Sequence, residues 1–258
     1  MPDWLYHLPV IWMSVVVVAG TALVAALVYG VAMAFAAHGR APMLKAVSPV
    51  MLTPLAVLFG LIVAFLCSQV WGDAQRANAT VAREASALRT VILLAANFPG
   101  DAETRIRALV RRHIRDAVDK EWPAMARQEA TLATPSAEAA EIPEMTLIVR
   151  AQNEAGAVVQ REMLSAFQAA NDARRERIVI SQSSINWIKW TAVFVLAILI
   201  LFTIAFVHID NRGTVAVAMT IFSVGAATCI VLIAAHNRPF TGEIRVGPDL
   251  LLQIMPRQ

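Results

Sequence analysis

The sequence predicts an all-α integral membrane protein with four transmembrane helices and a helical extramembrane domain inserted between the second and third of them. The 258 residues are 58% hydrophobic and 16% charged, whereas soluble domains carry about a quarter charged residues. Four apolar runs without Asp, Glu, Lys or Arg are each long enough to cross a bilayer. The predicted divisions are spans one and two in 1–72, the domain in 73–186, spans three and four in 187–236, and a tail in 237–258.

The first apolar run, residues 10–36, has two interpretations, a retained span and a cleaved signal peptide. A signal peptide needs a basic N-terminal region and a short apolar core. Residues 1–9 contain no Lys or Arg, and Trp4, Tyr6 and Trp12 stand where interfacial anchors of a span are expected. We therefore expect a retained span.

The second span, residues 51–71, is followed by charged sequence with no proline between Pro54 and Pro99. One helix from Pro49 to Asn97 would be about 70 Å long, more than twice the roughly 30 Å hydrocarbon core. We predict a helix that leaves the membrane and continues in water. Its aqueous half keeps an apolar stripe that needs a packing partner: Val81, Ala85, Leu88, Ile92 and Ala95.

Helical periodicity continues through the domain. An amphipathic helix is predicted over 101–122, and residues 128–143 are expected to form a loop. A new helix is predicted from Glu144 onward, and no proline interrupts it before Pro239. We expect this helix to run directly into the third span, 190–208, so that the domain is continuous with helices two and three. The fourth span is predicted at 214–235, and the tail returns to water.

The positive-inside rule gives two answers for the membrane side of the domain. The loop after the first span carries Arg40 and Lys45 and no acid, which favours this loop in the cytoplasm. A count over all the flanks of the spans favours the opposite side. Both alternatives stay open.

The positions of the charged residues favour some classes of membrane protein over others. No ionisable residue lies in the middle of a predicted span, and pumps or ion-coupled transporters normally need one there. A passive pore remains compatible. The net charge of +3, with acids interleaved among the bases, argues against a nucleic-acid partner. Neither Cys67 nor Cys229 belongs to a metal-ligand pattern, so we expect no metal site. The sequence shows no nucleophile with a base and no paired carboxylates, so we expect no enzyme activity and no cofactor.

One stripe of the second-span helix has the spacing expected for a pore lining. Apolar members would form a dewetting neck, and polar members would form a vestibule. The alternative is ordinary packing between helices or contact with lipid. The stripe consists of Leu55, Phe59, Ile62, Leu66, Gln69, Asp73 and Arg76.

Other motifs have structural and functional interpretations. The indole of Trp122, followed by Pro123, either packs under a turn at a helix end or contacts a partner. Arg83 and Glu84 point in different directions on a helix, so we expect salt bridges between helices. Arg238 and Arg245 are expected to bind lipid headgroups or an anion, or to bridge to acids of the domain.

Three segments in order, VAREASALR at 81–89, EWPAM at 121–125 and RPFTGEIRV at 238–246, resemble a bacterial membrane family of unknown function labelled bestrophin-like. The resemblance implies a multi-pass protein of the bacterial inner membrane. By analogy with bestrophins, it also implies a homo-oligomeric, pentameric anion channel lined by the second span. The competing hypothesis is a non-conducting structural or sensory protein whose domain binds a partner. Family features without an assigned role are Arg83, Glu84, Glu121, Trp122, Pro123, Arg238, Pro239, Phe240 and Gly242.

Overall fold

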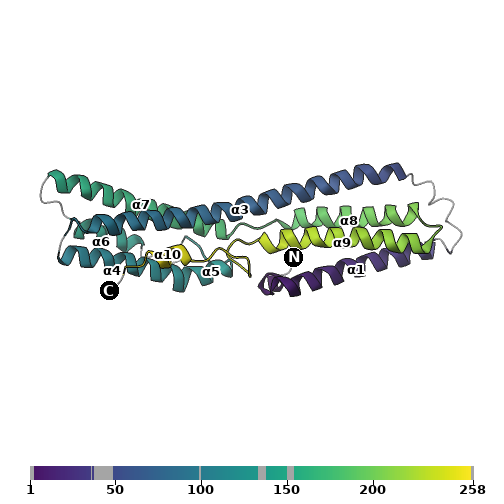
Figure 1. Ribbon diagram of the computed structural model, residues 1–258, viewed down its shortest axis with the longest axis horizontal. Helices are drawn as coiled ribbons and strands as arrows, with labels where there is room; N and C mark the ends of the chain where they lie inside the picture. The colour runs from purple at the N-terminus through teal and green to yellow at the C-terminus, as the bar shows by residue number, and fades with distance from the viewer. Residues whose placement is uncertain are drawn as a thin grey trace. The chain divides into compact units, whose positions relative to one another are not determined.

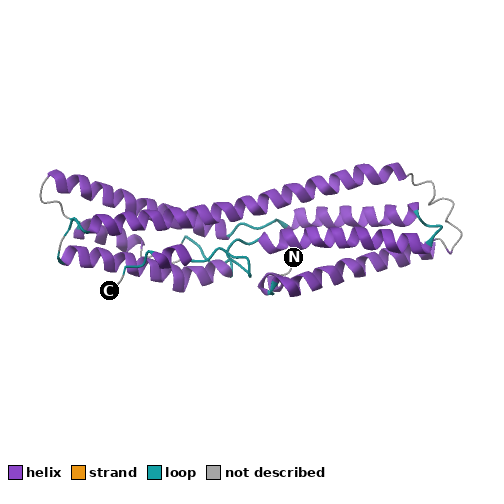
Figure 2. Cartoon of the chain, viewed as in Figure 1, coloured by secondary structure: helices purple, strands orange, loops and turns teal. Residues whose placement is uncertain are grey.

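The computed structural model describes residues 3–35, 37, 49–98, 100–132, 138–149 and 154–256. Every regular element in these ranges is a helix (Figure 2). The chain divides into two compact units: unit 1 is Met1–Trp71 with Ser184–Asn237, and unit 2 is Gly72–Ser183 with Arg238–Gln258. The loop residues Arg40 and Lys45, used for the membrane side, lie outside the described residues.

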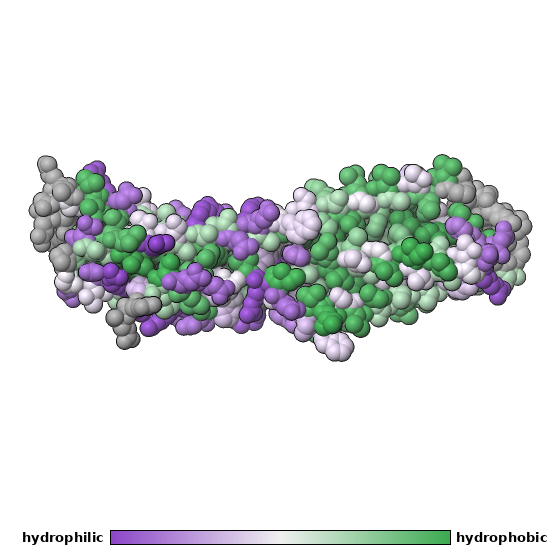
Figure 3. All heavy atoms as spheres, in the orientation of Figure 1, coloured by the Kyte–Doolittle hydropathy of each residue, from purple (hydrophilic) through white to green (hydrophobic). Residues whose placement is uncertain are grey.

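Unit 1 contains the apolar segments. Among the described residues, four helices are long and apolar enough to cross a membrane: α1 (Val10–Phe35), α3 (Leu52–Ala95) through its first half, α8 (Trp187–Val207) and α9 (Arg212–His236). A short helix, Asp3–His7, precedes α1, and another, Pro49–Met51, precedes α3. The visible face of unit 1 is mostly hydrophobic (Figure 3), as lipid-facing surfaces must be. The predicted layout of four spans, with a helical segment between spans two and three, is confirmed.

The core of unit 1 forms where α1, α8 and α9 pack together (Figure 1). From α3, Phe59 reaches this core, with its ring centroid 5.7 Å from that of Phe222 on α9. A buried amide ties the ends of three segments: Asn237 accepts a 2.8 Å hydrogen bond from the Ile185 backbone N–H and donates a 2.9 Å bond to the Tyr6 hydroxyl. These bonds satisfy polar groups that would otherwise be costly to bury.

Unit 2 is a helical domain built on the second half of α3. Its other helices are α4 (Asp101–Asp116), a π-helical turn η4 (Ala117–Glu121), α5 (Trp122–Ala126), α6 (Glu138–Ile148), α7 (Glu154–Ser181) and α10 (Asp249–Gln253). Each long helix turns an apolar face inward. The largest fully buried apolar side chains of the unit come from α3 to α7 and the tail: Leu88, Ile106, Leu109, Ile114, Met125, Met145, Met163, Phe167, Ile178 and Phe240.

The predicted continuity of the second-span helix is confirmed, because α3 runs for 44 residues without a break. The continuity predicted for the third span is wrong. α7 ends at Ser181, and α8 starts at Trp187 after Asn186, whose side chain accepts a hydrogen bond from the Ile188 N–H. Asparagine is a strong helix N-cap, and this local signal outweighs the absence of proline.

The predicted loop over 128–143 is also partly wrong. α6 begins at Glu138 and carries Pro143 in its interior, where proline removes one backbone hydrogen bond. Tertiary contacts compensate, since the Met145 side chain is fully buried and Glu141 is bound by His113. The helix predicted from Glu144 is further divided, because α6 ends at Ile148 and α7 starts at Glu154.

Candidate functional site

A fully buried arginine organises the interior of unit 2. Arg177 of α7 has no exposed surface, and its guanidinium binds Glu84 of α3 through two hydrogen bonds, Nε to Oε2 at 2.8 Å and Nη2 to Oε1 at 3.0 Å. Its Nη2 also donates to Oε2 of Glu121 at 2.9 Å. Paired charge-assisted bonds of this kind are the strong ones in proteins. Arg177 thereby joins α3, α7 and the π-helical turn.

A second arginine completes the binding of Glu121. Arg174 stands one helical turn before Arg177 on the same face of α7, and its Nε donates to Oε1 of Glu121 at 2.6 Å. Glu121 ends the five-residue π-helical turn between α4 and α5. A π-helical turn shifts the following side chains around the helix axis, and such turns recur at functional sites.

A buried histidine extends the cluster to α6. His113 of α4 lies between two carboxylates: Nδ1 is 3.0 Å from Glu141, and Nε2 is 3.3 Å from Glu84. Burial disfavours the protonated ring, but the bonds to Glu141 and Glu84 outweigh it and raise the pKa of His113 to about 9. Burial likewise opposes ionisation of Glu84, yet Arg177 and His113 lower the pKa of its carboxyl to about 2.

We call this set of six buried side chains the ionic cluster: Glu84, His113, Glu121, Glu141, Arg174 and Arg177. In its ionised form it contains three carboxylates and three cations, so the charges cancel. One oxygen of the cluster lacks a hydrogen bond: Oε1 of Glu141 is buried and has no hydrogen-bond partner in the described part of the chain. The cluster holds four helical segments and the π-helical turn in one arrangement.

Trp122 packs beneath the ionic cluster. The Arg177 guanidinium lies 4.2 Å from the centroid of the Trp122 ring, a cation–π contact. The indole N–H donates a 3.1 Å hydrogen bond to the Val246 carbonyl, and the ring meets Phe240 edge-on with centroids 6.0 Å apart. Trp122 therefore connects the cluster to the C-terminal tail.

The tail is held in a compact turn. The Val246 N–H donates to the Pro239 carbonyl at 2.8 Å, and the Thr241 hydroxyl donates to the Ala126 carbonyl at 2.7 Å. Gly242 has a φ of 85°, a left-handed conformation that favours glycine. The turn brings Phe240 and Val246 to the Trp122 side chain.

The model of the bestrophin-like domain matches residues 9–251 of the chain. This protein belongs to the bestrophin-like domain family. No curated protein and no solved structure matches it. The family resemblance predicted from the three sequence segments is thus confirmed, and the bestrophin-like protein is a multi-pass membrane protein with four candidate spans.

In this bestrophin-like protein the three family segments converge on one place. Glu84 and Glu121 bind Arg177, while Trp122 and Phe240 lie in contact beside it. The interhelical salt bridges predicted for Arg83 and Glu84 are present, both to α7. Arg83 binds Glu176 at 2.6 Å on the surface. The remaining motif residues shape the backbone or the tail: Pro123 in the first turn of α5, Pro239 and Gly242 in the tail turn, and Arg238 at its start.

Sequence reasoning missed Arg174, Arg177, His113 and Glu141. A signal for the arginines was present, because the buried positions of α7 recur as Met163, Phe167, Ala170, Arg174 and Arg177. Charged side chains at apolar-stripe positions indicate a buried ion pair. Glu84 shows the same signal in the stripe of α3, between Val81 and Leu88.

Part of the predicted pore-lining stripe of α3 is buried against other helices of the same chain. Phe59 and Leu66 are 9% and 1% exposed and belong to the core of unit 1, and Leu55 and Ile62 pack against that core. Gln69 accepts a 2.6 Å hydrogen bond from Lys189. Asp73 forms an ion pair with Arg76. A role of these residues in a pore lining stays a prediction.

No group of three or more His, Cys, Asp or Glu side chains within the described ranges is arranged to hold a metal ion. The carboxylates of the ionic cluster are instead occupied by guanidinium and imidazole groups. The arrangement is suited to fixing helices and not to binding a ligand, since burial closes the cluster to solvent.

The titration of His113 predicts how stability depends on pH. Its pKa is raised above the usual 6.5, so its stabilisation is complete below pH 6.5 and is lost as pH rises to about 9. We expect the free energy of unfolding of unit 2 to fall by up to about 3 kcal/mol over this interval. The lowered pKa of Glu84 predicts a second loss as pH falls from 4.5 towards about 2.

The measurement is urea unfolding of the full-length protein in detergent between pH 6 and pH 10. His113→Gln removes the titrating ring and should flatten the alkaline branch, while His236→Gln on the exposed end of α9 should leave it unchanged. An alkaline branch that persists in His113→Gln would contradict the assignment.

Proposed function

We propose that this bestrophin-like protein is a homo-oligomeric channel of the bacterial plasma membrane that passes small ions through an axial pore lined by α3. The observation that carries the proposal is α3 itself, one unbroken helix of 44 residues that is about twice as long as the roughly 30 Å hydrocarbon core is thick. The spans also lack a central ionisable relay, which suits passive conduction better than pumping. The proposal involves no catalytic step.

Two faces of α3 compete for the lining. The inward stripe packs against the chain's own helices at Phe59 and Leu66. A neighbouring, exposed face, which we call the outer face, carries Leu58, Leu61 and Phe65, which are 50%, 65% and 63% exposed. An axis formed by several copies needs a face that is not used within each copy. The outer face therefore supports the proposal better than the predicted stripe.

The ionic cluster holds the aqueous half of α3 in a fixed orientation. Glu84 lies in the aqueous half of α3, and Arg177 and His113 bind it from two other helices. These contacts fix the rotation of the aqueous half of α3 within unit 2. A fixed rotation is a condition for identical copies to present one face to an axis.

Cysteine accessibility tests the proposal. In a background of Cys67→Ala and Cys229→Ala, single cysteines replace Leu61 or Phe65 on the outer face and Phe59 or Ile62 on the inward stripe. After reconstitution in liposomes with anion or cation gradients, a charged thiol reagent should reduce ion flux at least fivefold at the outer positions, because a charge would occupy the neck. It should reduce the flux less than twofold at Phe59.

If the reagent instead reduced the flux at Phe59 or Ile62 and not at Leu61 or Phe65, the predicted stripe would line the pore. The native mass of the lipid-supplemented protein is the control, since an axial pore needs at least four copies. A monomer or dimer without flux would contradict the channel and favour the second hypothesis.

That second hypothesis is a structural or sensory protein whose domain binds a partner. It is favoured by large apolar side chains on the surface of unit 2, including Leu93, Leu147 and Val158, which are exposed by 65%, 77% and 58%. Exposed apolar side chains of this size on an aqueous domain mark contact surfaces when they cluster. It predicts no ion flux.

A further inference from the structure

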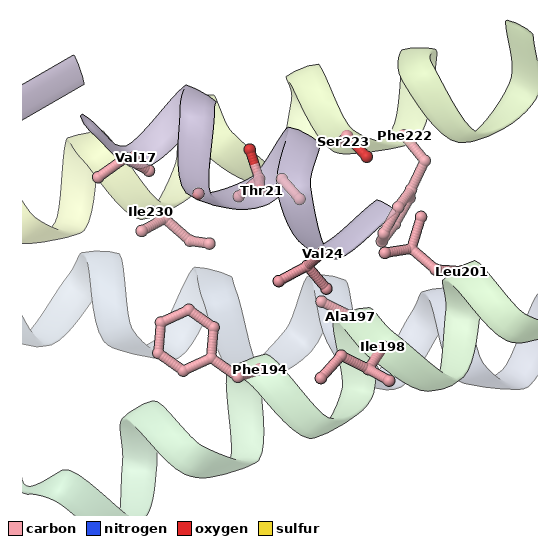
Figure 4. A pocket seen from close by; sticks show the side chains of 12 residues that line it. Val17, Thr21, Val24, Phe194, Ala197, Ile198, Leu201, Phe222, Ser223 and Ile230 are labelled. Atoms are coloured by element: carbon pink, nitrogen blue, oxygen red, sulfur yellow. The ribbon is translucent and has the colours of Figure 1, made fainter. Parts of the chain in front are cut away.

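Glu141 of α6 is the least compensated member of the ionic cluster. Its Oε1 is the one carboxylate oxygen of the described residues that is buried without a hydrogen-bond partner. The groove between α1, α8 and α9 in unit 1 contains no comparable group, because none of its lining side chains, such as Val24, Phe194 and Ile230, is ionisable (Figure 4). A change of protonation can therefore act on the buried interior of unit 2 through α6.

The two carboxylates that face His113 differ in what else binds them. Glu84 of α3 also accepts two hydrogen bonds from Arg177 of α7. Glu141 has no other hydrogen bond among the described residues, and His113 Nδ1 at 3.0 Å is its ion-pair partner. From α7 the ring also meets Phe167, edge-on with centroids 6.1 Å apart. The charge of Glu141 therefore depends on the proton of His113, whereas that of Glu84 does not.

A neutral His113 cannot serve both carboxylates. Neutral imidazole has one N–H and one lone pair, whereas the protonated ring has two N–H groups. If the neutral ring donates to Glu84, Glu141 is left buried without a hydrogen bond. If it donates to Glu141, the lone pair of Nε2 faces Oε1 of Glu84 at 3.3 Å. In both cases Glu141 loses its positive partner, and a buried charge without one is costly.

The helix that carries Glu141 has few other means of staying in place. α6 has only 11 residues, and isolated helices shorter than about 12–15 residues are marginal in water. Pro143 in its interior also removes one backbone hydrogen bond. Its second ion pair, Glu144 with Arg112 of α4, is half-exposed, and pairs of that kind contribute little. The position of α6 therefore rests on Met145 and its other buried side chains and on the bond from His113.

We propose that His113 and Glu141 form a latch that holds α6 against α4 while the ring is protonated and releases α6 when the ring loses its proton. Glu84 keeps Arg177, so the opening is confined to α6. The raised pKa of His113 places the release in the alkaline range. A change of pKa from 6.5 to about 9 allows the opening equilibrium to increase by at most about 300-fold. The inference does not depend on ion conduction.

Labelling of buried cysteines measures the opening. In the full-length protein in detergent, with Cys67→Ala and Cys229→Ala, Met145→Cys places a thiol in α6 and Ala170→Cys places one in α7, both at fully buried positions. The rate with a neutral disulfide reagent is divided by the rate of the same variant unfolded in urea at the same pH, which removes the effect of thiolate fraction.

The corrected rate at Met145→Cys should increase at least tenfold between pH 6.5 and pH 9.5. At pH 9.5 it should exceed the corrected rate at Ala170→Cys at least tenfold. Global unfolding also exposes His113 and speeds labelling at both sites as pH rises, so the difference between the two sites is the measure of local opening.

Two variants of the latch, made in the Met145→Cys background, should have opposite effects. Glu141→Gln removes the buried charge, so the corrected rate should stay slow and change less than threefold between pH 6.5 and pH 9.5. His113→Gln leaves Glu141 without a cation, so labelling at pH 6.5 should already be at least tenfold faster than in the parent. His236→Gln in α9 is the matched control and should behave as the parent does.

Three results would overturn the inference. Equal corrected rates at Met145→Cys and Ala170→Cys would show that unit 2 opens as a whole. A rate at Met145→Cys that does not increase with pH would exclude the latch. An increase that persists in Glu141→Gln would assign the opening to another group, and this variant decides the question even if His113→Gln does not fold.

Discussion

Replacing Arg177 by methionine is expected to destabilise unit 2 by about 3–5 kcal/mol, because it leaves Glu84 and Glu121 buried with reduced compensation. Arg177 has no exposed surface and makes three hydrogen bonds to these carboxylates. The free energy of unfolding is measured by urea titration and pulse proteolysis of the full-length protein in detergent. A loss under 1 kcal/mol would contradict the role of Arg177.

The control is a second ion pair between α3 and α7. Arg83 binds Glu176 on the surface, with side-chain exposures of 60% and 41%, so Arg83→Met should change stability by at most about 1 kcal/mol. Both arginines join α3 to α7, but Arg177 is buried and binds two carboxylates, whereas Arg83 is exposed and binds one.

A double variant tests whether the loss of stability comes from breaking the Glu84–Arg177 ion pair. Glu84→Met combined with Arg177→Met removes one carboxylate and one cation, while Glu121 keeps Arg174 and His113 keeps Glu141. Replacing a complete buried pair by apolar groups is often nearly neutral. The double variant should therefore lose clearly less stability than the sum of the single changes, and strict additivity would exclude a direct pairing energy.

Replacing Trp122 by alanine is expected to cost about 3–5 kcal/mol and to release the C-terminal tail. The change removes the ring against Arg177, the edge contact to Phe240 and the hydrogen bond to the Val246 carbonyl. Hydrogen exchange measures the second effect: amides of Thr241 and Val246, bonded within the tail turn, should exchange at least tenfold faster.

Two further variants serve as comparisons for Trp122→Ala. Trp122→Phe keeps a ring beneath Arg177 but loses the indole N–H, so it should cost about 1 kcal/mol. Trp187→Ala changes an indole that is 71% exposed and should leave exchange of the tail unaltered. Unchanged exchange at Thr241 in Trp122→Ala would mean that the tail is held without the indole.

Sequence patterns were sufficient to predict the four spans and the continuous α3. Both follow from local patterns, the length of uncharged apolar runs and the absence of proline between Pro54 and Pro99. They also identified Glu84, Glu121 and Trp122, although without partners. Local patterns sufficed because lipid selects long apolar helices whatever they pack against.

The contacts that Glu84, Glu121 and Trp122 make could not be predicted from the sequence. Glu84 and Arg177 are 93 positions apart, and nothing in the periodicity of either helix specifies the other. The direction of Phe59 and Leu66 likewise depended on packing against the core of unit 1. Periodicity determines which face of a helix is buried, whereas the partner of each buried charge is set by long-range packing, where an unpaired charge is too costly to keep.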